Sequence, residues 1–242
     1  MLNARPILRQ TGSGEGEKPF WISYADLMTA LMVLFLVVMV ISLLSVTQQL
    51  RQVKQRDVQR EQEIEKILDQ LGVEAQKFTG ISVSKERWTI DFGEKARFAV
   101  SDHRLSADAT RLLREFVPSI TKVARSDLGQ RWIKRVLVEG FTDPRGSYLF
   151  NLDLSLKRAH SVVCGLLAPV PGVPDLSADE VRAIQSLFLV GGFSFNGTRL
   201  SNDESRRVEL RLEFRMLDEV PTAAAPAADV PALIDTGRCQ LT

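Results

Sequence analysis

The feature that most constrains the fold is an apolar stretch near the start of the chain. Residues 27–50 form a run of 24 residues without a charged side chain. As a helix this run reaches about 36 Å, more than the roughly 30 Å hydrocarbon core of a bilayer. It is too long for the apolar part of a cleavable signal peptide, and no small-residue cleavage site follows it. We therefore predict a single membrane-spanning helix over residues 20–46, with a buried helix of a soluble core as the alternative.

Charge alone leaves the orientation of this helix open. Three basic residues precede the helix and four follow it closely, so the positive-inside rule does not decide which end of the helix is cytoplasmic. Cys164 and Cys239 permit one disulfide if the larger part of the chain lies outside the cytoplasm, but two buried thiols are equally ordinary.

The segments next to the helix have different compositions. Residues 1–19 are rich in glycine and lack hydrophobic periodicity, which indicates a flexible tail. Residues 47–79 are rich in charged and amide side chains, and their apolar residues follow a four-then-three spacing. This spacing predicts a helical neck that pairs as a parallel coiled coil in a homodimer; a single helix packed on its own domain is the alternative. The positions of the expected seam are Val46, Leu50, Val53, Asp57, Arg60, Ile64, Ile67 and Leu71.

Residues 80–218 alternate between strand and helix patterns. Alternating apolar residues predict strands within 81–92, 135–141, 187–193 and 207–214. Helical periodicity predicts helices after Ser106, over 152–167 with Asn151 as the cap, and over 178–188. The fold class is therefore a single N-terminal transmembrane helix followed by an α+β domain. Residues 219–242 form an Ala/Pro-rich tail.

Asp26 is the candidate for ion transfer. It stands at the edge of the apolar run, and helical spacing places it on one small, polar face with Ser23, Thr29, Ala30 and Val33. A carboxyl in hydrocarbon is costly and titrates more readily near neutral pH, as a proton carrier requires. The alternative is that the membrane begins after Asp26. The aromatic residues on its N-terminal side favour a position at or just inside the boundary.

A second candidate site follows the strand at 135–141. Asp143 lies in the connection and Arg158 in the next helix, so together they could bind the ammonium and carboxylate of a zwitterionic ligand. A plain salt bridge between them is the alternative.

Composition narrows the remaining function classes. There are 31 basic and 30 acidic residues, without the basic excess of a nucleic-acid-binding protein. His103 and His160 are isolated, and we find no nucleophile–base set, phosphate-binding loop or metal-ligand cluster. We predict no enzyme activity, no catalytic residues, no metal site and no cofactor.

Two family resemblances add to this interpretation. The segment Tyr24-Ala-Asp-Leu-Met-Thr-Ala-Leu-Met32 resembles the membrane segment of the MotB stator subunits. The resemblance implies that Asp26 takes and releases protons inside a ring of multi-span MotA-type subunits. It also implies an inner-membrane location, with residues 1–19 cytoplasmic and the large domain periplasmic.

The segment at 140–159 is similar to the peptidoglycan-binding signature of OmpA-like domains. This resemblance implies a βαβαβ-type periplasmic fold in which Asp143 and Arg158 hold the diaminopimelate of a stem peptide, while Thr142, Asn151 and Leu154 belong to the same site. The matching positions are Thr142, Asp143, Gly146, Asn151, Leu154, Ser155, Arg158 and Ala159.

The combination of the two segments most resembles the ZorB subunits, membrane partners of ZorA in Zorya anti-phage systems. This implies a proton-driven motor anchored to peptidoglycan by this subunit, with a ZorA-like ring as the partner. A flagellar MotB stator and a passive OmpA-like wall tether are the alternatives.

Overall fold

The computed structural model describes residues 18–169 and 171–219, and the chain divides into two compact units, residues 1–56 and 57–242. We describe each unit by itself. The predicted tails at 1–19 and 219–242 lie almost entirely outside the described residues.

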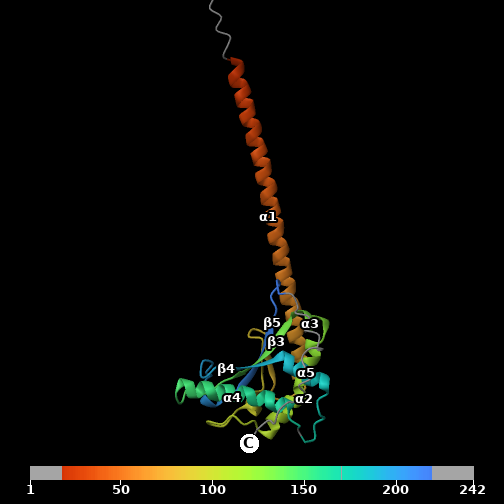
Figure 1. Ribbon diagram of the computed structural model, residues 1–242, viewed down its shortest axis with the longest axis vertical. Helices are drawn as coiled ribbons and strands as arrows, with labels where there is room; N and C mark the ends of the chain where they lie inside the picture. The colour runs from red at the N-terminus through yellow and green to blue at the C-terminus, as the bar shows by residue number, and fades with distance from the viewer. Residues whose placement is uncertain (1–17, 170, 220–242) are drawn as a thin grey trace, which may run out of the picture. The chain divides into compact units, whose positions relative to one another are not determined.

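The described part of the first unit is helical. It belongs to helix α1 (Lys18–Ala75), whose second residue is Pro19, a position that tolerates proline because the first turn leaves its N–H groups unbonded. Among the described residues, one helix is long and apolar enough to cross a membrane (Figure 1). No part of its most apolar stretch is buried against the rest of the described chain. The predicted span at 20–46 lies inside it.

The second unit begins with the C-terminal end of α1. Here four apolar side chains at helical spacing, Ile64, Ile67, Leu68 and Leu71, are buried in the core of the unit. Glu63 on the same segment accepts hydrogen bonds from Arg131 and from the indole of Trp132. The coiled-coil prediction is therefore wrong for Ile64, Ile67 and Leu71, because their own domain already covers them.

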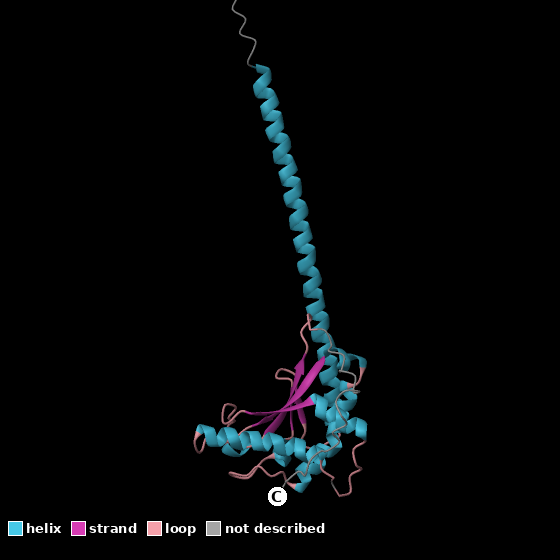
Figure 2. Cartoon of the chain, viewed as in Figure 1, coloured by secondary structure: helices cyan, strands magenta, loops and turns pink. Residues whose placement is uncertain are grey.

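A five-stranded mixed sheet forms the centre of the second unit, drawn in magenta in Figure 2. The strand order is β1-β2-β5-β3-β4, in which only β3 and β4 are parallel neighbours. The single strand pattern at 81–92 is in fact a hairpin of two short strands. The strands are β1 (Ser82–Ser84), β2 (Thr89–Asp91), β3 (Ile133–Gly140), β4 (Phe188–Gly192) and β5 (Val208–Phe214).

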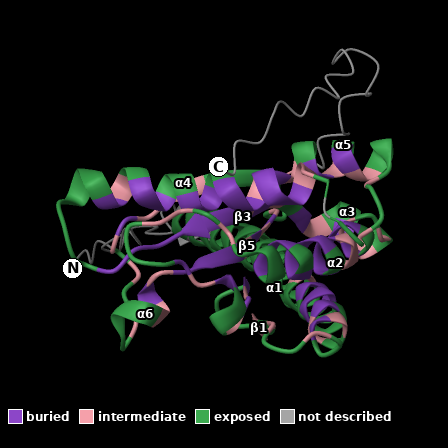
Figure 3. Cartoon of the chain, turned by 90° about the horizontal axis from the view of Figure 1, so that it is seen from below, coloured by how far each residue is buried: buried purple, intermediate pink, exposed green. Residues whose placement is uncertain are grey.

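Helices cover the apolar side of the sheet, and β3 and β5 are mostly buried (Figure 3). Ser106 caps its helix as predicted, whereas the fourth helix is capped by Ser147, four residues before the expected Asn151. The sequence pattern missed the three shortest helical segments. The elements are η1 (Gly93–Ala96), α2 (Ala107–Ala124), α3 (Asp127–Trp132), α4 (Tyr148–Leu167), α5 (Ala178–Leu187) and α6 (Asn202–Ser205).

Two glycines let α4 lie directly against the strands that carry the candidate site. A Cβ on Gly140 would stand 1.9 Å from the carbonyl oxygen of Ser155, and one on Gly192 would stand 2.8 Å from the amide nitrogen of Leu156. Any side chain at either position would push α4 away from the sheet. The fold class, an N-terminal apolar helix followed by an α+β domain, is confirmed.

Candidate functional site

Asp26 lies in the exposed part of α1, one position before the apolar run. The Thr29 hydroxyl donates to the backbone oxygens of Ala25 and Asp26, at 3.0 and 2.9 Å, and so is used within the helix. Within the part of the chain that the structure describes, no hydrogen bond or ion pair reaches the Asp26 carboxylate. The side chain of Ser23, expected on the same face, lies outside the described residues.

The second candidate site is a small pocket between the loop after β3, the start of α4 and the segment before α2. All five residues expected there, Thr142, Asp143, Asn151, Leu154 and Arg158, line it. The structure therefore brings together the residues that the sequence signature grouped. The complete lining is Val100, Ser101, Thr142, Asp143, Arg145, Phe150, Asn151, Leu154 and Arg158.

Asp143 is held by two guanidinium groups. Nη2 of Arg145 lies 2.7 Å from Oδ2 of Asp143 and Nε lies 3.2 Å from Oδ1, while the Arg145 amide donates to Oδ1 at 3.1 Å. Nη1 of Arg206 donates to Oδ2 at 3.2 Å. These donors, chiefly the Arg145 side chain, lower the pKa of Asp143 to about 2. The carboxylate is therefore ionised at neutral pH and already satisfied within the chain.

Arg158 forms the buried floor of the pocket. Its Nε, Nη1 and Nη2 atoms donate to the backbone oxygens of Asp102, Phe141 and Ala99, at 2.9, 2.8 and 3.0 Å. The guanidinium also lies over the Phe98 ring, 5.0 Å from its centroid. Burial lowers the pKa of Arg158 to about 10, so it remains charged at neutral pH. Of five N–H donors, two remain for a ligand.

A direct ion pair between Asp143 and Arg158, the alternative to ligand binding, is not among the contacts of the described residues. Asp143 bonds to Arg145 and Arg206, and Arg158 bonds to backbone oxygens. The alternative interpretation, a plain salt bridge between these two residues, is therefore wrong.

Two polar neighbours complete the pocket. Nδ2 of Asn151 donates to the Arg145 backbone oxygen at 2.9 Å, which fixes the loop that ends at Gly146, a residue with φ of +96°. The Thr142 hydroxyl oxygen is buried and has no hydrogen-bond partner among the described residues. A buried hydroxyl without a partner is costly, so a ligand or water group at this point would be favourable.

Charge and size together define what the pocket can accept. The charged side chains that line the pocket are the guanidinium groups of Arg145 and Arg158 and the carboxylate of Asp143, so the lining carries a positive excess. Such an excess favours a ligand that brings carboxylate groups. The free space inside the pocket is about 30 Å³, enough for one or two water molecules, and the pocket opens to solvent.

Arg145 and Arg206 are site residues that the sequence analysis missed. Arg145 had a local signal, since it stands two residues after Asp143 in an Asp-Pro-Arg-Gly turn. Arg206 is 63 residues from Asp143 in the sequence, and no local pattern relates the two.

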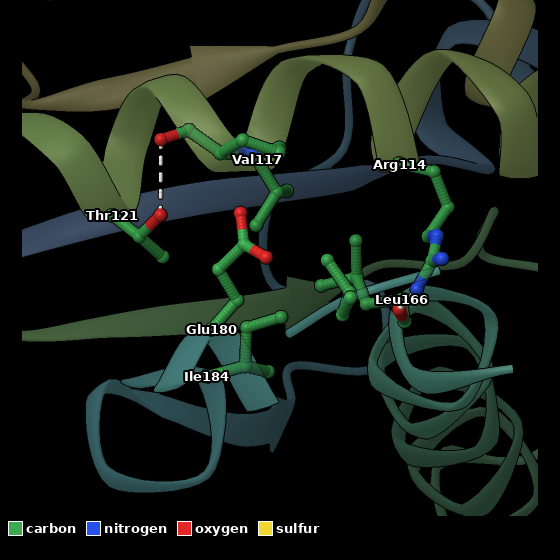
Figure 4. Close-up of a pocket in the computed structure, with 8 residues that line it drawn as sticks. Arg114, Val117, Thr121, Leu166, Glu180 and Ile184 are labelled. Atoms are coloured by element: carbon green, nitrogen blue, oxygen red, sulfur yellow. Dashed lines mark hydrogen bonds between the residues drawn. The ribbon is translucent and has the colours of Figure 1, made fainter. Parts of the chain in front are cut away.

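A second hollow lies between α2, α5 and the end of α4, shown in Figure 4. Arg114 crosses it and donates to the backbone oxygens of Leu166 and Pro174, at 2.6 and 3.1 Å. The hollow has no room for a water molecule, and most of its lining is apolar. We interpret Arg114 as a structural residue whose hydrogen bonds fix the position of the loop after α4.

The chain is similar to the Zorya protein ZorB of Escherichia coli O139:H28. The two sequences are 43% identical over 236 residues, which cover 97% of this chain and 96% of that protein. The chain belongs to the ZorB family. Residues 8–56 of this ZorB-family chain also match the family model described as membrane MotB of the proton-channel complex MotA/MotB. These residues are therefore similar to the membrane segment of MotB proteins.

Two solved structures are similar to part of this ZorB-family chain. The cell wall anchor of the type VI secretion system of Pseudomonas aeruginosa is 21% identical, with a TM-score of 0.38, over 61% of this chain and 97% of that one. The periplasmic domain of Helicobacter pylori MotB is 17% identical, with a TM-score of 0.35, over 54% and 78%. We rest no functional argument on these likenesses.

Proposed function

We propose that the chain is a peptidoglycan-anchored stator-type subunit of a proton-driven inner-membrane complex that acts in anti-phage defence. The observation that carries this proposal is the pairing, in one ZorB-family chain, of a carboxyl at the edge of an apolar helix with a charged ligand pocket in a folded domain. The first can transfer ions and the second can hold the complex in place.

Asp26 is the proton-carrying residue of the proposal. Its carboxylate has no partner among the described residues, and a carboxyl at the membrane boundary must find one in other protein chains. The match of residues 8–56 to a proton-channel subunit supports a multi-span, ZorA-type ring as that partner. We extend the proposal to a homodimer in which two Asp26 carboxyls lie inside the ring.

The pocket around Asp143 and Arg158 is the proposed peptidoglycan site. A stem peptide that contains diaminopimelate offers an ammonium for Asp143 and carboxylates for the positive excess around it. This places the second unit in the periplasm, so the chain crosses the inner membrane once with residues 1–19 in the cytoplasm.

The test of ion transfer is Asp26→Asn in a phage-protection assay. We expect loss of protection with normal membrane insertion and normal co-purification with the ring, because the amide keeps the shape but cannot release a proton. Asp57→Asn is the matched control, since Asp57 is an exposed acid on the same helix beyond the apolar run. Full protection by Asp26→Asn would overturn the proton role and favour a passive tether.

Rescue of swimming in a strain without its flagellar stator would instead favour the flagellar alternative. We expect no rescue, because the family relationship is to a Zorya protein.

The test of wall anchoring is binding of the detergent-solubilised chain to purified sacculi. We expect Asp143→Asn to lose most binding, because a charge-assisted contact is worth about 1.5–3 kcal/mol. Asp153→Asn is the matched control, since Asp153 is an exposed acid on α4 that pairs with Lys157. Equal binding by wild type and Asp143→Asn would contradict the proposed site. Arg158→Ala is a poor test, because it also releases three backbone oxygens.

A further inference from the structure

The position that a ligand ammonium would take on Asp143 is already occupied. The Arg145 guanidinium covers both carboxylate oxygens, through Nε to Oδ1 at 3.2 Å and Nη2 to Oδ2 at 2.7 Å. A ligand ammonium needs those same oxygens, and the free space beside them is enough for one or two water molecules. Binding at Asp143 therefore requires one of its two arginines to move.

Arg145 is the arginine that can move. Its side chain is 55% exposed, and Asp143 is the only group that its guanidinium contacts among the described residues. The Arg206 side chain is 11% exposed and is held by additional bonds to the Phe98 backbone oxygen and to Asp203. Arg145 therefore gives up only its bonds to Asp143 when it moves into solvent, whereas Arg206 would also give up its bonds to Phe98 and Asp203.

We propose that Arg145 determines the ligand specificity of the pocket. Its guanidinium occupies the position of a ligand ammonium, and only ligands that carry a carboxylate beside their ammonium displace it. The inference rests on the proposed peptidoglycan site. A diaminopimelate side chain ends in a zwitterion, so its ammonium takes Asp143 while its carboxylate receives the displaced Arg145 guanidinium. A lysine side chain brings the ammonium alone and leaves Arg145 without a partner.

The charge of the pocket supports this exchange. Among the charged residues that line the pocket, Arg145 and Arg158 outnumber Asp143, so an incoming lysine raises the positive excess, whereas an incoming zwitterion leaves it unchanged. Two effects therefore oppose the displacement of Arg145 by a lone amine. The ion pair between Arg145 and Asp143 is lost, and the amine is repelled by Arg206 and Arg158.

The experiment measures binding of two synthetic muramyl tripeptides to the full chain in detergent. The tripeptides differ only in the third residue, meso-diaminopimelate or lysine, and the affinities are read by calorimetry. For wild type we expect tight binding of the diaminopimelate peptide and weak binding of the lysine peptide. For Arg145→Gln we expect the ratio of the two affinities to fall by about tenfold, chiefly because lysine binds better once its competitor is removed.

Arg104→Gln is the matched control. Arg104 pairs with Asp102 two residues earlier, through a backbone amide at 2.9 Å and a guanidinium at 3.2 Å, as Arg145 does with Asp143, but it does not line the pocket. We expect the control to keep the wild-type ratio.

The outcomes separate the two proposals. An unchanged ratio in Arg145→Gln, with wild type still binding diaminopimelate, would overturn the role of Arg145 and leave the peptidoglycan site standing. Equal loss of both ligands in Arg145→Gln would also overturn it, because Arg145 would then be an ordinary contact. Failure of wild type to bind either tripeptide would overturn the peptidoglycan site and the role of Arg145 with it.

Discussion

The two ends of helix α1 carry similar apolar spacing but meet different surroundings. In the first unit the apolar side chains are exposed, Leu50 for example at 64%, and Asp26 has no partner within the described chain. In the second unit Ile67 and Leu71 are fully buried, and even the charged Asp143 is satisfied by arginines of its own domain. The described part of the first region leaves its apolar side chains uncovered by this chain, whereas the second region covers its own. Periodicity shows that a face is buried, not what buries it.

The largest expected effect comes from removing the buried C-terminal end of α1. We expect a fragment of residues 80–219 to fail to fold, because it lacks four large apolar side chains of the core, whereas residues 57–219 should fold. Each buried side chain of this size contributes about 1.5–3 kcal/mol, against a typical total stability of about 5–15 kcal/mol. Near-ultraviolet circular dichroism of the two fragments checks this. A folded 80–219 fragment would show that the end of α1 is not an essential part of the core.

A pair of substitutions sharpens the comparison. Leu71→Ala should destabilise the domain by about 2–5 kcal/mol, since it opens a cavity in the core, and so lower the thermal midpoint by roughly 5–15 °C. Leu50→Ala, at an exposed position on the same helix, should change the stability by less than about 0.5 kcal/mol. Thermal unfolding of the full chain in detergent measures both. Similar midpoints for the two variants would contradict the division of the helix into exposed and buried ends.

The interactions of Asp143 should contribute to the acid stability of the second unit. The pKa of Asp143 in the folded state, about 2, lies below its ordinary value near 3.9, so its stabilisation is present above about pH 4 and is lost as pH falls to about 2. Asp143→Asn should remove about 2 kcal/mol of this pH-dependent stability. Urea unfolding at several pH values between 2 and 6 measures the difference. Superimposable profiles for wild type and Asp143→Asn would contradict the contribution of the pair.

The sequence predicted the apolar helix, the main strands and helices, and the five expected pocket residues. Those features depend on local periodicity or on a motif of about twenty neighbouring residues. It did not predict that α1 ends inside the domain, because the same apolar spacing suits a coiled coil. It missed Arg206 on Asp143, since that contact depends on how distant strands pair. The cap of α4 was misplaced because Ser147 and Asn151 are both favourable cap residues.

The three backbone oxygens bound by Arg158 have a consequence for how this pocket can change over evolutionary time. A residue that ties three separate segments together cannot be exchanged to tune a ligand preference without loosening the floor itself. The side chains of Arg145 and Phe150 on the rim are more exposed, and neither bonds to a backbone oxygen of another described residue. New ligand preferences on this scaffold should therefore arise at the rim while the floor stays fixed, and a designer who wishes to redirect the pocket should randomise the rim first.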